Sequence, residues 1–381
     1  MSWRKITLED ICISIADGDH QPPPKSDNGI PFVTISNITN TNKLDFTDTM
    51  FVSQEYYDNL NDKRRAHTGD ILYSVVGSFG IPVFIDKEQK FVFQRHIAIL
   101  RPDPQKIVPR FLYYMMLSRD FYMKADTVAL GAAQRTISLT ALRKMEMEVP
   151  PYNVQEKIVK ILKPFDDLIE NNQKQIKLLE EAAQRLYKEW FVDLRFPGYE
   201  KVKIVNGVPE GWKKVGLVDI APILTGKKDA NYGTNDGEYL FFTCAQEPIK
   251  APSYSFDCDA VILAGNGDFN VKLYRGKFEA YQRTYIFSPI NKSNLFLLYY
   301  AVRANMKSLF QGASGSTIKF LTKRMLEEIQ VYIPTKNIKL YFNMYSESYH
   351  KKIETLNAQI QLIKEARNRL LPKLMDGRIE V

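Results

Sequence analysis

The sequence has few of the residues that build disulfide frameworks or zinc sites, and no segment that could cross a membrane. Its 3 cysteines, Cys12, Cys244 and Cys258, have no paired spacing, which favours a reduced compartment without structural disulfides. The 4 histidines are far apart in the chain, so no zinc motif is visible. No apolar run reaches the roughly 18 residues of a membrane helix, and the N-terminus has no signal-peptide hydrophobic region. We therefore expect a soluble, cytoplasmic protein without a bound metal.

Acidic residues are outnumbered by basic ones. The chain has 52 Lys and Arg against 44 Asp and Glu, which gives a net charge of +8 at pH 7. This balance favours an anionic partner, although by itself it describes only solubility and non-specific binding. A length of 381 residues is enough for two or three domains with cores of their own.

The main positive feature is an internal repeat. Segments of the first half recur in the second half in the same order. The pairs are residues 3–11 and 212–220, Phe93-Gln94-Arg95 and Tyr281-Gln282-Arg283, Thr136-Ile137 and Thr317-Ile318, and residues 176–186 and 360–370. A period this long excludes a solenoid. It predicts two similar globular units, each followed by a long helix, and two similar units usually serve a two-part target.

Each copy is rich in strands at first and helical later. Residues 71–76 and 261–264 are β-branched or apolar runs that end at glycine, and residues 91–100 are apolar apart from Gln94, Arg95 and His96. Such bounded runs predict buried strands. Residues 111–116 and 296–302 are predicted to be helices that cover them. We predict two α+β domains, residues 1–150 and 205–333.

The segments after the two domains, residues 151–200 and 334–381, have the heptad pattern of a coiled coil. Alternate steps of three and four define a seam in each segment. The first seam is Ile158, Ile161, Phe165, Leu168, Asn172, Gln175, Leu179, Ala182 and Leu186. The second is Phe342, Tyr345, Tyr349, Lys352, Leu356, Gln359, Ile363, Ala366 and Leu370. Pro164 is predicted to break or kink the first helix near its start.

A second apolar file lies beside each seam. Because a two-stranded coil needs only a narrow seam, the wider stripe predicts packing against a further helix. We predict that this file binds a partner protein. Its members are Leu162, Ile169, Ile176, Ala183 and Trp190 in the first helix and Ile353, Ile360 and Leu374 in the second.

Together these features resemble the specificity subunit of type I restriction–modification systems. Residues 149–158 resemble the family's entry to its first spacer helix, and residues 370–377 resemble its usual C-terminal segment. The resemblance implies two target-recognition domains joined by antiparallel helices, which read a bipartite double-stranded DNA sequence around an unread spacer. It implies two methyltransferase subunits and ATP-driven translocase–nuclease subunits as partners. S-adenosylmethionine, ATP and Mg²⁺ are then expected in those partners, and no cofactor or catalytic residue in this chain.

Polar loops that occur in both copies are the candidate DNA contacts. Arginine pairs with guanine and glutamine with adenine at base edges, while small and hydroxyl residues let the backbone approach DNA and bond phosphates. The alternative is that the Gln-Arg pairs cap a strand or bind phosphate. The candidates in the duplicated loops are Ser78, Gln94, Arg95, His96, Gln134, Arg135, Thr136, Gln282, Arg283, Thr284, Ser314, Ser316 and Thr317. Lys227 and Lys228 are added as plausible phosphate contacts.

Two other functions compete with DNA recognition. Asp70, Glu88 and Lys90 fit a loose D…E-x-K pattern, in which carboxylates hold Mg²⁺ and the lysine polarises the attacking water of a nuclease. The second copy does not repeat this triad. The other alternative is a coiled-coil adaptor whose two domains bind proteins.

Overall fold

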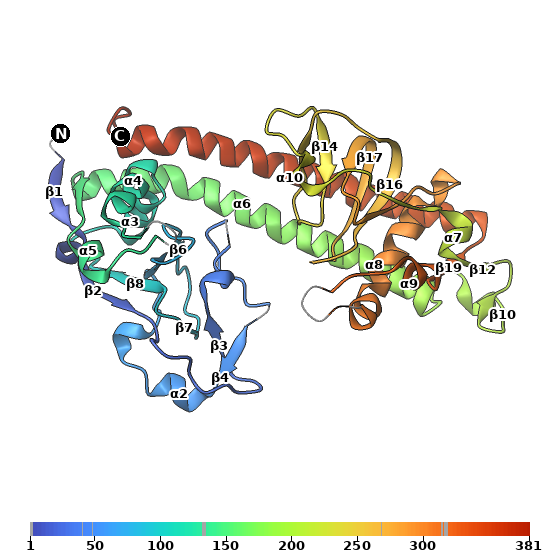
Figure 1. Cartoon of the computed structure of the whole chain (residues 1–381), viewed down its shortest axis with the longest axis horizontal. Helices are drawn as coiled ribbons and strands as arrows, with labels where there is room; N and C mark the ends of the chain where they lie inside the picture. The colour runs from blue at the N-terminus through green and yellow to red at the C-terminus, as the bar shows by residue number, and fades with distance from the viewer. Residues whose placement is uncertain are drawn as a thin grey trace. The chain divides into compact units, whose positions relative to one another are not determined.

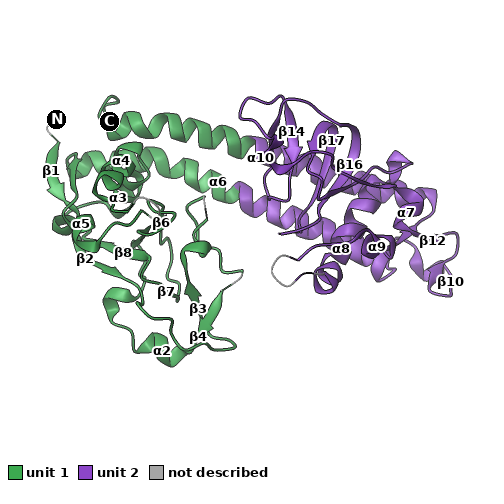
Figure 2. Ribbon diagram, in the orientation of Figure 1, with its two compact units in different colours: residues 1–171, 359–381 green, residues 172–358 purple. Residues whose placement is uncertain are grey.

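The computed structural model describes residues 3–39, 41–47, 49–131, 135–267, 269–313, 315 and 319–381. The chain divides into two compact units, residues 1–171 with 359–381, and residues 172–358 (Figure 2). Both units mix helices and sheet (Figure 1). Two long helices, α6 (Tyr152–Tyr187) and α10 (Lys336–Met375), each contribute residues to both units.

Unit 1 is built on two small sheets. Its four-stranded sheet has the order β2-β8-β5-β6, with bounds β2 (Cys12–Asp17), β8 (Ile97–Pro102), β5 (Ile71–Ser74) and β6 (Pro82–Phe84). A three-stranded sheet consists of β4 (Met50–Val52), β3 (Ile30–Val33) and β7 (Val92–Phe93). A third pair joins β1 (Arg4–Thr7) to β9 (Glu146–Val149). The helices are α1 (Leu8–Ile11), α2 (Gln54–Asp58), α3 (Pro109–Met116), α4 (Arg119–Val128) and α5 (Leu139–Arg143), with short turns η1 (Ile35–Asn37) and η2 (Asp62–Arg64).

The predicted helix at residues 111–116 is confirmed as α3, whose side chains are buried in the core of unit 1. The single strand predicted over residues 91–100 is wrong, because the chain turns between β7 and β8. The N–H of Ile97 donates to the carbonyl of Gln94 at 3.0 Å, which closes a turn over the three polar residues. The two strands then belong to different sheets.

Unit 2 has a six-stranded sheet of order β13-β18-β16-β17-β14-β15. The strands are β13 (Ile223–Thr225), β14 (Tyr239–Phe242), β15 (Ile249–Ala251), β16 (Phe256–Ala264), β17 (Val271–Ala280) and β18 (Thr284–Phe287). Strand pairs β10 (Ile204–Val205) with β11 (Val208–Pro209) and β12 (Lys213–Gly216) with β19 (Gln330–Ile333) complete it. Its helices are α7 (Leu217–Ile220), α8 (Leu295–Gly312) and α9 (Lys323–Glu327), with short turns η3 (Lys188–Val192), η4 (Tyr199–Lys201), η5 (Ala230–Tyr232) and η6 (Lys292–Asn294). The helix predicted at residues 296–302 is confirmed within α8, which packs on β16 and β17.

Pro164 does not interrupt the first long helix, so the predicted break is wrong. The helix α6 runs from Tyr152 to Tyr187 with Pro164 inside it. A proline inside a helix costs about 3 kcal/mol, while each large apolar side chain that is fully buried contributes roughly 1.5–3 kcal/mol. Ile158, Leu162 and Ile169 are buried on both sides of the proline. Their burial outweighs the lost hydrogen bond and the strain.

The inward faces of the long helices follow steps of four and three, in the opposite order to the predicted seams. Leu168 of the predicted seam is 50% exposed while Ile169 is buried. The inward series of α6 is Ile158, Leu162, Phe165, Ile169, Asn172, Ile176, Leu179, Ala183, Leu186 and Trp190. The inward series of α10 is Phe342, Ser346, Tyr349, Ile353, Leu356, Ile360, Ile363, Arg367, Leu370 and Leu374. In each helix the predicted and the observed series have every second residue in common. The predicted series would have turned Gln175, Lys352 and Gln359 inward.

The burial of the two long helices also corrects the prediction of a second apolar file that binds a partner protein. Every member of that file belongs to the inward series. Leu162, Ile169, Trp190, Ile360 and Leu374 are buried by the chain itself, and Ile176 and Ile353 are half-buried. The prediction of a second file that this chain leaves uncovered is therefore wrong, because the members of the file are buried or half-buried by the chain itself.

In the part of the chain that the structure describes, no helix combines the length and the apolar character that a membrane span requires.

Candidate nucleic-acid interface

In unit 1, three of the predicted loops meet at one end of the four-stranded sheet. The N–H of Val75, just after β5, donates to the carbonyl of His96 at 2.9 Å. The N–H of Gly77 donates to the carbonyl of Arg135 at 3.2 Å, and that of Ile137 donates to the carbonyl of Val75 at 2.9 Å. The loops that carry Ser78, residues 94–96 and residues 135–136 thus form one cluster.

A fourth loop, which the sequence analysis missed, holds the turn at residues 94–96 in place. Asp19 donates its N–H to the carbonyl of Phe93 at 2.8 Å and accepts the N–H of Arg95 at 3.0 Å. A Cβ on Gly18 would lie 1.9 Å from the Phe93 oxygen, so only glycine permits this approach. A glycine after a strand was the available signal, but nothing in the sequence paired it with the turn.

The carboxylate of Asp19 is buried and held by neighbours from η2 and α2. The hydroxyl of Tyr56 donates to it at 2.9 Å, and the guanidinium of Arg64 lies 3.5 Å away. Burial, followed by the hydrogen bond to Asp19, raises the pKa of Tyr56 to about 12. The hydroxyl of Tyr56 therefore keeps its proton and its hydrogen bond to Asp19. This bond helps to hold Asp19 in place beside the turn.

Exposure divides the unit 1 candidates into two groups. Ser78 and Arg95 are exposed, and Gln94 and His96 are half-buried. Arg135 is occupied within the chain, since its Nε donates to the Asp126 carboxylate at 3.0 Å. This ion pair gives Arg135 a structural partner that the sequence did not reveal.

Unit 2 contains the same cluster. Gly265, just after β16, donates its N–H to the carbonyl of Arg283 at 2.8 Å and accepts the N–H of Leu321 at 2.8 Å. The N–H of Gln282 donates to the carbonyl of Lys228 at 2.9 Å. The duplicated turn and its glycine-bearing loop are therefore present in both units.

The unit 2 candidates differ in accessibility. Lys227, Gln282 and Arg283 are exposed, and the ammonium of Lys228 lies 4.4 Å from the ring centre of Tyr232. Thr284 is 0% exposed, and its hydroxyl donates to a backbone carbonyl at 3.4 Å. Its prediction as a DNA contact is wrong, because the first residue of β18 turns its side chain into the core. Gln134, Ser314, Ser316 and Thr317 lie outside the described residues.

The structure corrects the alignment of the two copies. The backbone hydrogen bond from Val75 to His96 in unit 1 corresponds to the bond from Gly265 to Arg283 in unit 2. Likewise, the bond from Arg95 to Asp19 corresponds to the bond from Gln282 to Lys228. Arg95 is thus equivalent to Gln282, and His96 to Arg283. The Gln-Arg match in the sequence is displaced by one residue, because identical letters were aligned rather than equivalent backbone positions.

Thr136 was also aligned with the wrong residue. An isolated bridge joins Val76 to Thr136, and the equivalent bridge joins Asn266 to Phe320. Thr136 is therefore equivalent to Phe320, and the pairing of Thr136 with Thr317 is wrong.

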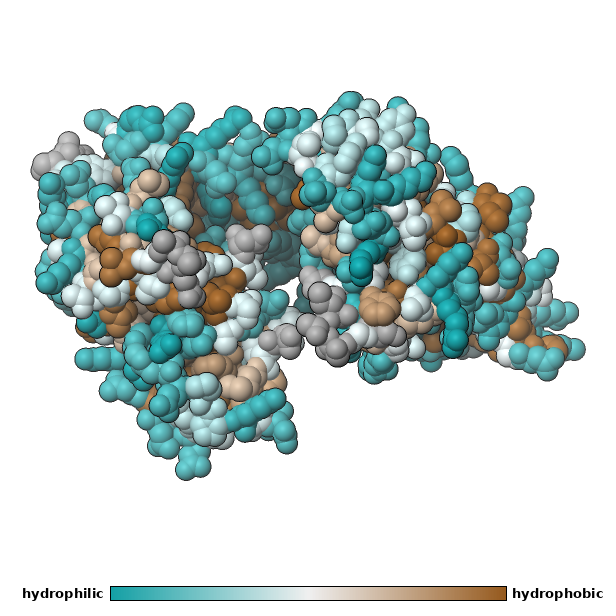
Figure 3. Space-filling view, in the orientation of Figure 1, coloured by the Kyte–Doolittle hydropathy of each residue, from teal (hydrophilic) through white to brown (hydrophobic). Residues whose placement is uncertain are grey.

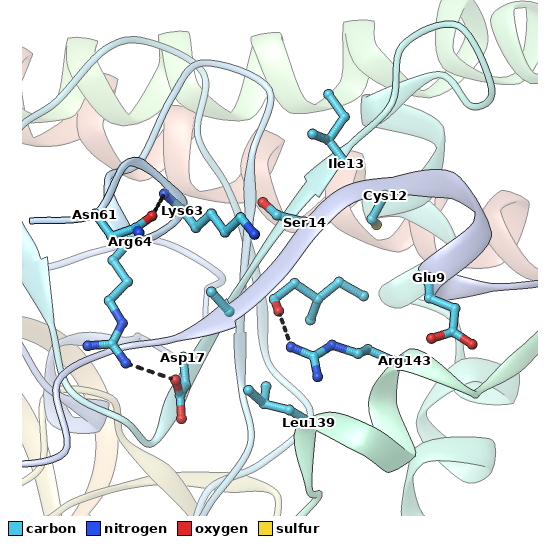
Figure 4. Close-up of a pocket in the computed structure, with 12 residues that line it drawn as sticks. Glu9, Cys12, Ile13, Ser14, Asp17, Asn61, Lys63, Arg64, Leu139 and Arg143 are labelled. Carbon is cyan, nitrogen blue, oxygen red and sulfur yellow. Dashed lines mark hydrogen bonds and ion pairs between the residues drawn. The ribbon is translucent and has the colours of Figure 1, made fainter.

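A groove of about 580 Å³ lies beside the edge strand β2 in unit 1 (Figure 4). Lys63, Arg64 and Arg143 line it, together with Glu9 and Asp17. Arg64 is paired with Asp17 at 3.4 Å, and the guanidinium of Arg143 donates to the carbonyl of Ile15 at 2.6 Å. Cationic side chains outnumber carboxylates along the groove by three to two, but Arg64 is paired with a carboxylate and Arg143 bonds a carbonyl of the sheet edge.

The residues of the nuclease alternative do not form a metal site. Asp70 is 2% exposed, accepts the N–H of His67 at 2.9 Å and pairs with Arg101 at 3.3 Å. Burial raises its pKa from the usual value. Glu88 is exposed, and the ammonium of Lys90 lies over the Tyr57 ring. Among the residues that the structure covers, no group of three His, Cys, Asp or Glu is placed to hold a metal ion.

Comparisons with known proteins agree on one family. The family profile "Type I restriction modification DNA specificity domain" matches residues 2–181 and 209–371. The chain is 38% identical over 176 residues to the type I restriction enzyme EcoDI specificity subunit of Escherichia coli, a match that covers 45% of this chain and 39% of that protein. It is 26% identical to the putative type I restriction enzyme MjaX specificity subunit of Methanocaldococcus jannaschii, over 100% of this chain and 94% of that protein.

A solved structure has the same fold. The S subunit of a type I restriction-modification system from M. genitalium is similar with a TM-score of 0.58 and 16% identity. The similarity covers 98% of this chain and 96% of that chain.

Proposed function

Because the chain belongs to the type I restriction–modification DNA specificity family, we propose that it reads a bipartite DNA target, one half-site with each unit. It is a specificity subunit, a non-catalytic member of such systems. The observation that carries the two-part reading is the duplicated loop cluster. Both units present an exposed polar turn on a strand end, clasped by a glycine that permits no side chain. Neither the nuclease nor the adaptor alternative is supported by the family or by the described residues.

The recognition domains are residues 1–150 and 205–333, and the long helices space them. Arg95 and Ser78 in the first domain, and Lys227, Gln282 and Arg283 in the second, are exposed in the loop clusters. Side chains of these types bond base edges or phosphates. The net charge of +8 favours approach to the DNA backbone. The chain would act in the cytoplasm, where its target DNA is accessible.

The helices α6 and α10 form an antiparallel coiled coil in this proposal. Packing within each unit supports it. In unit 1, Ile158 and Leu162 from the first part of α6 share a core cluster with Leu371 and Leu374 from the last part of α10. In unit 2, the Trp190 ring, just after α6, lies 6.1 Å from the Phe342 ring near the start of α10. Opposite ends of the two helices therefore meet in each unit.

The partners are two methyltransferase subunits and, for cleavage, ATP-driven translocase–nuclease subunits. S-adenosylmethionine, ATP and Mg²⁺ belong to those subunits. Their docking sites must use exposed residues, since the inward series of the helices is occupied by this chain. The face drawn in Figure 3 is mainly hydrophilic, with scattered apolar patches. Among the exposed large apolar side chains of the described residues, Leu178 and Leu362 lie at equivalent positions of the helix repeat and are 64% and 66% exposed. They would offer one apolar contact to each methyltransferase copy.

Methylome sequencing tests the function directly. Cells that express the chain with its methyltransferase subunit should gain one methylated motif with two specified halves and an unspecified spacer. Cells that express the methyltransferase subunit alone are the control and should lack the motif. A motif of one continuous block, or no new motif with both proteins present, would contradict the proposal.

A further inference from the structure

We infer that Arg95 and Gln282 are the specificity-determining residues at one equivalent position of the two half-sites, and that they select guanine in one half and adenine in the other. The inference rests on the proposed function and deepens it. The two half-sites then have different bases where Arg95 and Gln282 contact them, although the two recognition units are copies of one fold.

Backbone hydrogen bonds establish that the two residues are equivalent. Each bond around the first turn has a counterpart around the second. The pairs of donors and acceptors are Gly18 to Ile97 (3.3 Å) and Gly226 to Thr284 (3.0 Å), Gln94 to Val33 (3.0 Å) and Tyr281 to Phe242 (2.9 Å), Arg95 to Asp19 (3.0 Å) and Gln282 to Lys228 (2.9 Å), and Ile97 to Gln94 (3.0 Å) and Thr284 to Tyr281 (2.8 Å). No shift of one residue preserves this set. Arg95 and Gln282 therefore occupy the same place in the turn.

The backbone of this turn is fixed in both units. The strands β3 and β7 pair in parallel in unit 1, as β14 and β17 do in unit 2, and the turn follows directly. A Cβ on Gly226 would lie 2.3 Å from the carbonyl oxygen of Ala280, and Gly18 has the matching contact with Phe93. A turn clasped in this way presents its side chains from a constant position, as base readout requires.

The two side chains have the right chemistry for different bases. The Arg95 guanidinium is exposed and can donate two hydrogen bonds to O6 and N7 of guanine. The amide of Gln282 is exposed, and its Nε2 donates to the Asp229 carboxylate at 2.9 Å. That bond uses one of the two amide hydrogens and orients the amide. The second hydrogen and the Oε1 remain for N7 and N6 of adenine.

The neighbouring positions of the turn are less suited. Gln94 and Tyr281 are both half-buried, and His96 is half-buried where Arg283 is exposed. Only the Arg95 and Gln282 position is exposed in both units. It is therefore the position from which both units can read a base of their half-site in the same way.

Reciprocal substitution tests the inference in the assembled complex. Arg95→Gln should change the preferred base from guanine to adenine at one position of one half-site, and Gln282→Arg should make the opposite change in the other half-site. Each variant should lose preference for the original base by roughly ten- to hundredfold, the discrimination of one good bidentate contact. The readout is the methylated motif of cells that express each variant with the methyltransferase subunit. Arg369→Gln, which removes an exposed guanidinium from α10, is the matched control and should leave the motif unchanged.

The possible outcomes distinguish a failure of the proposed function from a failure of this inference alone. A wild-type complex that methylates no bipartite motif overturns the proposed function and this inference with it. If the wild type is active and both turn variants keep its motif, this inference alone is overturned. Uniformly weaker methylation with unchanged bases assigns the turn to phosphate binding and also overturns it. A selection of bound sequences from a random DNA library with the purified complex gives a second readout that does not depend on methylation.

Discussion

Arg367 on α10 donates to the carboxylate of Asp166 on α6 at 2.7 Å, across 201 residues of sequence. The hydroxyl of Tyr114 on α3 donates to the other oxygen of Asp166 at 2.7 Å, and burial raises the pKa of this tyrosine. One carboxylate therefore joins the two long helices to the core of unit 1. No feature of the sequence marks this contact.

Replacement of this carboxylate should destabilise the chain. Asp166→Asn leaves a mostly buried guanidinium without its ion pair, and we expect a loss of about 1–3 kcal/mol in the free energy of unfolding. Asp167→Asn is the matched control, because Asp167 makes only an exposed pair with Lys163 on the same helix. Such pairs contribute roughly 0.3–0.5 kcal/mol. Denaturant unfolding of the two variants gives the comparison, and equal losses would contradict the role of Asp166.

The glycines beneath the two turns should be sensitive to a single methyl group. Gly18→Ala or Gly226→Ala places a Cβ against a backbone carbonyl, so the loop must move away from the turn and specific DNA binding should fall at least tenfold. Gly216→Ala is the control, since the nearest atom to its Cβ is a side-chain oxygen of Asp219 at 3.1 Å. Affinity for the methylated motif is the measurement. Unchanged affinity in both turn variants would show that the turns do not contact DNA.

Arg283 and Arg135 should behave differently although both were predicted to contact DNA. Arg283→Ala should weaken specific binding by about 1–3 kcal/mol if the side chain reads a base. Arg135→Ala removes the ion pair with Asp126. It should lower the free energy of unfolding and leave the preference for target over non-target DNA unchanged. Affinity on target and non-target duplexes, with unfolding curves of both variants, separates the two effects. A loss of base preference in Arg135→Ala without a loss of stability would contradict the structural role.

The burial pattern of α10 predicts opposite results for two residues that are two positions apart. Ile360 is 4% exposed and Leu362 is 66% exposed. Ile360→Glu places a carboxylate at a buried position that has an apolar side chain in the wild type, and it should lower the free energy of unfolding by several kcal/mol. Leu362→Glu should leave the unfolding free energy within about 0.5 kcal/mol and reduce co-purification of the methyltransferase subunit. If Ile360→Glu is as stable as the wild type, the seam has the other phase.

The long helices should set the length of the unread spacer. One heptad added to both helices, near Asn172 and Leu356, keeps every inward residue in phase. The helices grow by about 10.5 Å at roughly 1.5 Å per residue, so the spacer should lengthen by about three base pairs at ~3.4 Å each. Methylome sequencing of this variant gives the new spacer, and the half-site bases should not change. An unchanged spacer with full activity would show that the helices do not measure the distance.

The amino-acid sequence alone determined the duplication, the mixed domains and the family. These properties depend on local patterns that the chain carries in itself. The apolar runs at residues 111–116 and 296–302 were predicted to be helices, and both are confirmed. The repeat of residues 93–95 at residues 281–283 located both polar turns, although it is displaced by one residue from the equivalent backbone positions.

Only the tertiary structure decided which backbone positions are equivalent and which side chains are free. Arg95 corresponds to Gln282 because distant loops bond the turns, not because of any local sequence identity. Two interleaved heptad series on α6 and α10 are both plausible by periodicity, and packing selected the one that turns Ile169 and Ile360 inward. Thr284 became a core residue and Arg135 an ion-pair partner for the same reason. A residue's hydrogen-bond partner and burial depend on segments far away in the chain, and their positions are established only when the chain is packed.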